Sequence, residues 1–267
     1  MSSLTEPLLD APAPGWSHDL SEPIASPSMR PYPPAMSNSP NHMDNIYLEL
    51  HRATSRVRGI GVWLAIMGAP VVAALISGLG TYIALTNNPK LYLMVITLTV
   101  IFGASWICIY VWRMDTAAPR DEPIRFNRAR RKVYVYRFYH DGRRPLSRTA
   151  WFTRAEVYNW DDLRAEACEV YGPMGSGGLI QTVTLAVVKP GTNEVIDRFH
   201  FAHGGLEGEM YWALAQLYMQ QGPDALPEFE YLPRDWNNED VTLNLARYLA
   251  PKVKWPEDMD LESRTAP

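Results

Sequence analysis

The sequence has few cysteines, and those it has are unsuited to a disulfide. Cys108 and Cys168 are the only two in 267 residues; the first lies in an apolar run and the second in a region of mixed composition. Reduced thiols are typical of domains that face the cytoplasm, where disulfides are rare. We therefore interpret Cys168 as a small core residue of a strand and not as a nucleophile.

Large apolar residues are scarce in the first 45 residues. Pro, Ser, Ala and Asn crowd this segment, and such a composition buries too little surface to offset the entropy lost on ordering. We predict a disordered Pro/Ser-rich tail over residues 1–45 and a juxtamembrane segment over 46–58. A polyproline ligand at residues 30–34 is the alternative to a plain flexible tail.

Charge is almost absent from the next region. Lys90 is the only charged residue between Arg58 and Arg113, and it separates two apolar runs at 59–86 and 91–112. About 27 residues at roughly 1.5 Å each span more than a hydrocarbon layer of about 30 Å. We predict a two-helix transmembrane hairpin over 59–112; helices buried in a soluble protein are the alternative, but these rarely lack a polar face.

Two patterns set the expected orientation and packing of this hairpin. Basic residues flank the hairpin at the two ends away from its turn, which places both termini in the cytoplasm. These bases are Arg52, Arg56, Arg58, Arg113 and Arg120. The expected location is a bacterial inner membrane. Small residues predict where the helices pack together. Ala65 with Ala69 and Ser77 with Thr81 recur at four-residue spacing, and Gly103 with Ala104 lies midway along the second helix.

Beyond about residue 120 the composition is that of a packed domain rich in strands. Val133 and Val135 alternate with Tyr134 and Tyr136, as in a strand, and further strands are expected at 151–157, 165–171, 179–188 and 195–201. No crossover helix fits between them, so we expect a mostly antiparallel meander.

The hydrophobic period then changes, which predicts one amphipathic helix. Its apolar face is formed by Leu206, Met210, Ala213, Leu214 and Leu217, and Gly222 with Pro223 ends it. The predicted fold class is α+β: a cytoplasmic, mostly antiparallel β domain over 120–233 with the layout of the pleckstrin-homology-like (PH-like) superfold. A short helix and an acidic tail are expected over 234–267.

Four short segments carry a resemblance to a family of uncharacterised bacterial membrane proteins. They are PIRFNR at 123–128, the basic residues 130–132 that lead into VYVYRF at 133–138, WDDL at 160–163, and QGPDALP at 221–227. The members resemble two-helix anchors that carry a small β domain, in proteobacteria with type VI secretion systems, often beside secreted effectors. The resemblance covers residues 59 to about 230 and leaves out residues 235–267.

Signatures of catalysis and of metal or cofactor binding are missing. His200 and His203 are the only close histidine pair, and residues three apart in a strand point to opposite faces. Asp161 and Asp162 are adjacent carboxylates of the kind that cap chain ends. The glycines between 172 and 178 precede strand residues and no Gly-Lys-Ser/Thr sequence. We predict a protein that is not an enzyme and needs no cofactor.

Charged residues gather in two regions, and the net charge of −4 indicates no bulk affinity for nucleic acid. Bases near anionic lipid headgroups gain about 1 kcal/mol each. The predicted membrane-proximal basic patch is Arg125, Arg128, Arg130, Arg131, Lys132 and Arg137, with Arg143, Arg144 and Arg148 further along. Acidic side chains that could bind a basic partner are Glu228, Glu230, Asp235, Glu239 and Asp240.

These observations predict a membrane-anchored, non-enzymatic protein-binding protein. The resemblance implies a type VI secretion system, in which an immunity protein that neutralises a cognate effector would fit. The alternative is a lipid-sensing or scaffold (adaptor) module of the secretion machinery that uses the basic patch. The expected partners are the phospholipid bilayer and a secreted effector, toxin or secretion-system component.

Overall fold

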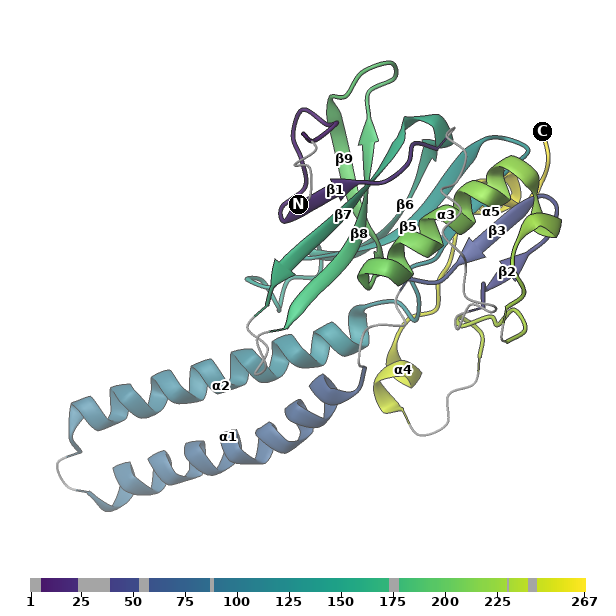
Figure 1. The fold of residues 1–267 in the computed structure, drawn as a ribbon. Helices are drawn as coiled ribbons and strands as arrows, with labels where there is room; N and C mark the ends of the chain where they lie inside the picture. The colour runs from purple at the N-terminus through teal and green to yellow at the C-terminus, as the bar shows by residue number, and fades with distance from the viewer. Residues whose placement is uncertain are drawn as a thin grey trace.

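The structure, a computed structural model, describes residues 6–23, 39–52, 58–86, 89–172, 178–229, 231–239 and 244–267. Over these ranges the chain forms two antiparallel sheets, a helix packed against them, and two long helices that project together from the domain (Figure 1). The predicted α+β class with antiparallel sheets is confirmed.

Each sheet contains a run of strands that are consecutive in the sequence. The first sheet has the order β2 (His42–Met43), β3 (Tyr47–Leu50), β4 (Ile124–Asn127), β5 (Lys132–His140) and β6 (Trp151–Asn159). The second has the order β1 (Trp16–Asp19), β7 (Leu163–Tyr171), β8 (Leu179–Val188) and β9 (Val195–His203). A single turn of helix, η1 (Trp160–Asp162), leads from β6 into β7.

The core lies between the sheets and is closed by α3 (Gly205–Gln221). Val133 and Val135 of β5 point into it, as their alternation predicts, and Trp160 and Trp212 meet there with ring centroids 5.1 Å apart. α3 ends at Gly222 as predicted, where a φ of 94° favours glycine. Its apolar face starts later than expected, because Leu206 in the first turn is 58% exposed.

Residues 6–23 and 39–45 are part of the domain, which corrects the prediction of a disordered tail at these positions. β1 pairs with β7, and β2 pairs with β3. The fully buried carboxylate of Glu166 accepts a hydrogen bond from the backbone amide of Ala13 (2.8 Å) and pairs with Arg198. These residues are therefore held by polar groups that lie elsewhere in the chain, and the polyproline candidate at 30–34 lies outside the described residues.

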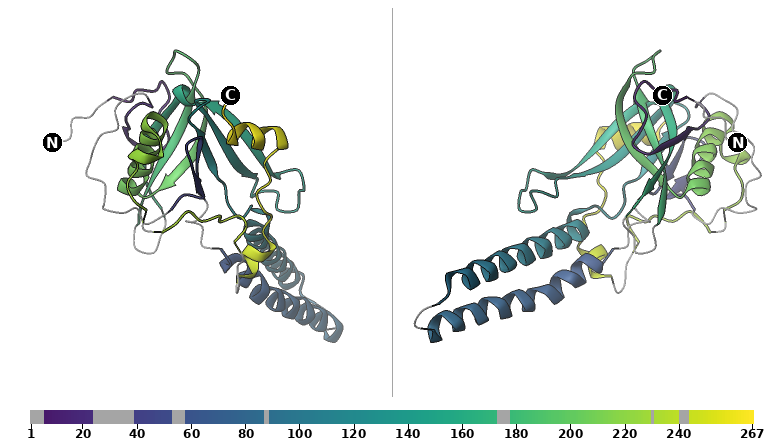
Figure 2. Two further views of the ribbon diagram at one scale, coloured as in Figure 1. Left: turned by 90° about the vertical axis from the view of Figure 1, so that its right-hand side faces the viewer. Right: turned by 60° about the vertical axis from the view of Figure 1, so that its left-hand side comes forward.

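The two long helices, α1 (Ile60–Leu85) and α2 (Leu91–Ala117), form an antiparallel hairpin inserted between β3 and β4. These strands are antiparallel neighbours, so both inner ends of the hairpin meet the domain at one place (Figure 2). Each helix is long and apolar enough to cross a membrane. Of the residues in the most apolar stretch of each helix, only 11% are buried in α1 and 0% in α2.

Small residues bring α1 and α2 together in their inner halves, which are the halves nearest the domain. A β-carbon at Gly68 would lie 2.6 Å from the Sγ of Cys108, and one at Gly61 would overlap the carbonyl oxygen of Val111. Ala65, between these glycines, is also buried. Residues 61, 65 and 68 are separated by four and then three positions. This alternation is the spacing of residues that face a neighbouring helix along its length.

The other small residues predicted at this interface lie elsewhere. Ala69, Ser77 and Thr81 are exposed, and the Thr81 hydroxyl donates to the carbonyl of Ser77 in its own helix (2.9 Å). A β-carbon at Gly103 would meet no atom of the described residues within 4 Å. The prediction was wrong at these positions because residues spaced by four at every step rotate away from the neighbouring helix. The residues that face a neighbouring helix alternate between steps of three and four.

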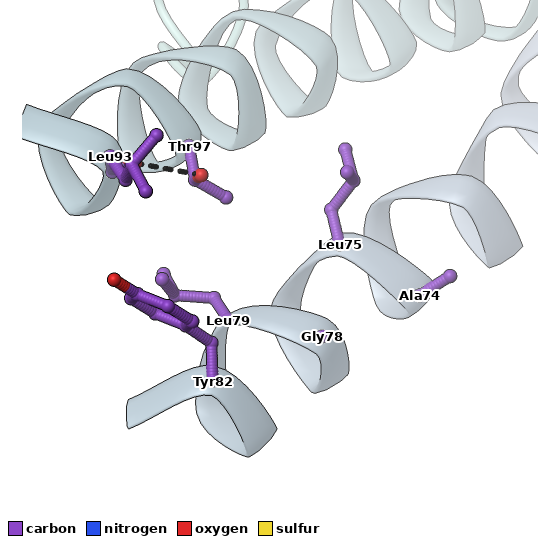
Figure 3. A pocket seen from close by; sticks show the side chains of 7 residues that line it. All are labelled: Ala74, Leu75, Gly78, Leu79, Tyr82, Leu93 and Thr97. Carbon is purple, nitrogen blue, oxygen red and sulfur yellow. Dashed lines mark hydrogen bonds between the residues drawn. The ribbon is translucent and has the colours of Figure 1, made fainter. Parts of the chain in front are cut away.

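Towards the turn the helices diverge around a small cavity of about 300 Å³. Figure 3 shows its lining, which is apolar except for the hydroxyls of Tyr82 and Thr97. The Thr97 hydroxyl donates to the carbonyl of Leu93 (2.9 Å) and the Tyr82 oxygen accepts from the amide of Lys90 (3.0 Å). An apolar gap of this kind suits an acyl chain better than a polar ligand.

Candidate functional sites

Arg125 is the centre of a polar cluster on the outer face of the first sheet. Its guanidinium pairs with Glu49 and with Asp260 (2.6 Å), donates to Ser263 (2.8 Å), and lies 4.4 Å from the ring centroid of Trp255. The side chain is only 3% exposed because α5 (Glu257–Arg264) covers it. Buried cations are stable only when paired and hydrogen-bonded in this way.

The other bases of the predicted patch are also engaged within the domain. Arg128 lies against Gly222, and the remaining four bond as follows: Arg130 to the carbonyls of Thr265 and Ala266, Arg131 to Asp161, Lys132 to Glu262, and Arg137 to Glu156 and Asp197. The turn between β4 and β5 lies beside the carboxyl terminus, away from α1 and α2 (Figure 2). The membrane-proximal location of the patch and its binding of lipid both stay predictions.

A hydrogen-bonded network joins the two sheets around Arg137. The Tyr158 hydroxyl lies 2.6 Å from Asp197 and 2.9 Å from Glu156, and Arg137 lies 2.9 Å from Glu156. Burial opposes ionisation of Asp197, but hydrogen bonds from Tyr158 and the Arg198 amide, together with Arg137, lower its pKa below the ordinary value. Burial raises the pKa of Tyr139 to about 12. At neutral pH this network is a fixed bridge of charges and neutral phenols.

Two arginines complete the bridge by bonding to the backbone of β9. Arg137 donates to the carbonyl of Arg198 (2.9 Å), and Arg52 donates to the carbonyls of His200 and Tyr136 (each 2.6 Å). Both β9 carbonyls belong to an edge strand of the second sheet. Arg52 is thus a structural residue of the domain, although its position in the sequence suggested a base that flanks the membrane.

The histidine pair departs from its predicted geometry. Thr184 pairs with His200 and Val183 with Ala202, so β9 contains one extra residue, a β-bulge. The bulge shifts the alternation by one position and brings His200 and His203 to the same side, with ring centroids 4.1 Å apart. Over the described ranges, no group of three His, Cys, Asp or Glu side chains could hold a metal ion.

The other residues considered for chemistry have local structural roles. Cys168 is buried in β7, as predicted, and burial raises the pKa of its thiol. Asp161 pairs with Arg131, and Asp162 accepts a hydrogen bond from Asn159 (2.9 Å). The amide of Gly172 donates to the carbonyl of Gly178 (3.2 Å), which closes the β7–β8 hairpin; residues 173–177 lie outside the described part of the chain.

A polar cavity of about 520 Å³ adjoins the Arg125 cluster and was not predicted from the sequence. It lies between β2 and β3 on one side and the segment 252–264 on the other, and its walls include His42, Tyr47, Lys252 and Trp255. The rings of His42 and Tyr47 stack at 4.3 Å. Its lining bears side chains of both charges, which favours a small polar ligand over an apolar one.

Some of the acidic side chains predicted to bind a partner bond instead to residues nearby in the chain. Asp235 accepts hydrogen bonds from the amides of Asn237 and Asn238, and Glu239 pairs with Arg234. Glu228 is exposed, whereas Glu230 and Asp240 lie outside the described residues. Partner binding by these acids stays a prediction. In the same segment Tyr231 is 60% exposed and Leu232 is 87% exposed, and sequence analysis missed both.

These features define a small α+β domain that carries a pair of long apolar helices and several polar surface sites. The profile of a group described as "Family of unknown function (DUF6708)" matches residues 101–267, and the chain belongs to this family. No curated protein and no solved structure matches the sequence. The match extends to the last residue, so it includes the segment 235–267 that the resemblance left out.

Proposed function

We propose that the chain is a membrane-anchored, non-enzymatic protein-binding protein. The observation that carries this proposal is the exposure of Tyr231 and Leu232, at 60% and 87%, in the acidic segment that follows α3. Large apolar side chains surrounded by polar residues are typical of protein interfaces, where aromatic residues supply much of the binding energy. The neighbouring exposed carboxylate of Glu228 favours a basic partner.

The exposed apolar surface of α1 and α2 supports membrane anchoring. In a soluble protein such helices would be covered by the rest of the chain. Here only 11% of the most apolar stretch of α1 and 0% of that of α2 are buried. Bases lie near the inner ends of both helices, and Lys90 is the only one near the turn. We infer a bacterial inner-membrane protein with both termini in the cytoplasm.

The order of elements supports the PH-like assignment. Four successive strands, β3 to β6, lie in one sheet, three more, β7 to β9, lie in the other, and α3 follows them. The transmembrane hairpin would then be an insertion after the first strand of that fold. A fold of this kind indicates no activity by itself, so the function rests on the exposed surface.

The resemblance to proteins encoded beside type VI effectors suggests the biological form of the proposal. An immunity protein would hold its cognate effector at the membrane through the surface around Tyr231 and Leu232. The alternative, a lipid-sensing or adaptor module that uses the predicted basic patch, has less support because five of its six bases bond within the chain.

Growth protection tests this proposal directly. A strain that expresses the effector encoded next to the chain is complemented with the wild type or with a double variant, Tyr231→Ala with Leu232→Ser. The control variant is Leu261→Ser, because Leu261 is 68% exposed on α5, in another part of the surface. We expect protection to be lost only with the double variant. Equal protection by all three proteins would overturn the proposed surface.

A further inference from the structure

The loop between β5 and β6, residues 141–150, is fastened to the inner end of α2. Arg113 donates to the carbonyls of Pro145 and Ser147, and its guanidinium lies 4.8 Å from the ring centroid of Trp151. Tyr110, one turn earlier in α2, packs against Gly142 and against Trp151. The position of the loop along α2 is therefore fixed.

This loop exposes bases and one large apolar side chain. Leu146 is 66% exposed, and Arg143, Arg144 and Arg148 are exposed around it. Arg144 lies 3.6 Å from Asp141, but that pair is open to solvent and weak. Within the described part of the chain, Arg143 and Arg148 form no ion pair. An exposed leucine among arginines is the composition of segments that lie on membrane surfaces.

A second apolar group lies beside the inner end of α1. Asn244 donates to the carbonyl of Arg58 (3.2 Å), which places the following short helix, α4 (Leu245–Leu249), next to the start of α1. α4 also contacts α2. Tyr248 is 71% exposed and Leu249 42% exposed, so this helix exposes apolar side chains. α4 lies at the end of the hairpin where α1 begins (Figure 1).

The length of α2 places the β5–β6 loop at the depth of the lipid headgroups. α2 has 27 residues, or about 40 Å, whereas the hydrocarbon layer is about 30 Å thick. If the turn at Lys90 lies at one interface, the last turns of α2 pass through the opposite headgroup layer. Tyr110 and Arg113, which hold the β5–β6 loop, lie in these turns, and the loop must share their depth.

We propose that the β5–β6 loop and α4 form a second contact with the bilayer, in which Leu146 and Tyr248 enter the interface while Arg143, Arg144 and Arg148 bind anionic lipid phosphates. The proposal rests on the proposed membrane anchoring. Its bases lie in the β5–β6 loop, whereas those of the predicted basic patch lie between Arg125 and Arg137. Its consequence is that the domain is held at a fixed orientation to the membrane and does not hang from a flexible connection.

Depth-dependent fluorescence quenching in the full chain tests this contact. Single cysteines replace Leu146, Tyr248 or, as a control, Leu261 on α5 in a background with Cys108→Ala and Cys168→Ala. Each protein is labelled with a fluorophore and reconstituted into vesicles of phosphatidylcholine with phosphatidylglycerol that carry a headgroup-level quencher. We expect strong quenching at positions 146 and 248 and weak quenching at 261. Equal, weak quenching at all three positions would overturn the contact and leave the surface to solvent or a protein.

Removal of the three bases tests the recognition of anionic lipid. The variant R143Q/R144Q/R148Q should lose the increase in quenching at position 146 that phosphatidylglycerol causes over pure phosphatidylcholine. The matched control R154Q/K189Q/R264Q removes three exposed charges elsewhere and should keep it. If both variants respond alike, the bases bind no lipid phosphate. Extraction at alkaline pH separates the two levels of proposal, since release of the chain would refute the anchoring itself.

Discussion

The carboxylate of Asp115, near the inner end of α2, accepts a hydrogen bond from the backbone amide of Val62 in the first turn of α1 (3.0 Å). The same oxygen accepts the amide of Gly59, also at 3.0 Å. The first amides of a helix have no partner within it, and Gly59 has no side chain to cap them. The neighbouring helix therefore supplies the cap, and its negative charge faces the positive end of the α1 dipole.

Replacement of Asp115 by Ala should destabilise the helix pair by about 1 kcal/mol, the usual effect of removing an N-cap. Asp115→Asn keeps an acceptor and should lose less. The measurement is chemical unfolding of the detergent-solubilised chain, with Asp10→Ala, at an exposed site, as the control. A stability for Asp115→Ala equal to that of the control would show that the cap contributes nothing.

Alanine at Gly68 should separate α1 from α2, because its β-carbon would lie 2.6 Å from the Sγ of Cys108. Overpacking of this kind costs about 1–3 kcal/mol. Gly103→Ala is the matched control: its added carbon meets nothing among the described atoms within 4 Å, and alanine favours helix by roughly 1 kcal/mol. Thermal unfolding in detergent should rank the proteins with Gly68→Ala lowest, and the reverse order would contradict the helix interface.

Removal of residues 1–23 should destabilise the domain. The deletion takes away β1 and the Ser21 hydroxyl that donates to the fully buried amide oxygen of Gln216 (3.0 Å), and it leaves the carboxylate of Glu166 without the Ala13 amide. Each buried polar group that loses its partner costs about 1–3 kcal/mol. A deletion of residues 1–5 is the control. A disordered tail would predict no change in melting temperature for either deletion.

His51 should make stability depend on pH near neutrality. Burial is the largest effect on this side chain and lowers the pKa of His51 below 6.5. Because the folded state binds a proton less readily than the unfolded state, the stabilisation is complete above about pH 6.5 and is lost as the pH falls through the folded pKa. Melting temperature measured from about pH 7.5 to about pH 5.5 should fall less in His51→Phe than in the wild type. Parallel curves would exclude His51 as the cause.

Local patterns in the sequence were sufficient for the strands from β5 onward, for α3 and for the two apolar helices. Val133 and Val135 lie on the face of β5 that points into the core between the sheets, and Gly222 ends α3 because it adopts a positive φ. These features depend on residues close together in the chain.

The rest depends on residues far apart in the chain, which a single sequence does not reveal. Arg125 looks like a free base until Asp260 and Glu49 are placed beside it. His200 and His203 share a face only because β9 contains a bulge, and no residue in the sequence of β9 predicts that bulge. Glu166 and Gln216 gave a weak signal that was missed: polar residues at positions where the pattern calls for apolar ones.

The insertion of α1 and α2 between β3 and β4 has a consequence for biosynthesis. During translation β3 emerges before its neighbour β4, and the whole hairpin must be made before the two strands can pair. The aminoterminal strands must wait for that event with their apolar side chains exposed. Under the proposed membrane anchoring, the hairpin would be available to the bilayer while β3 is still unpaired, and the later emergence of β4 would complete the first sheet.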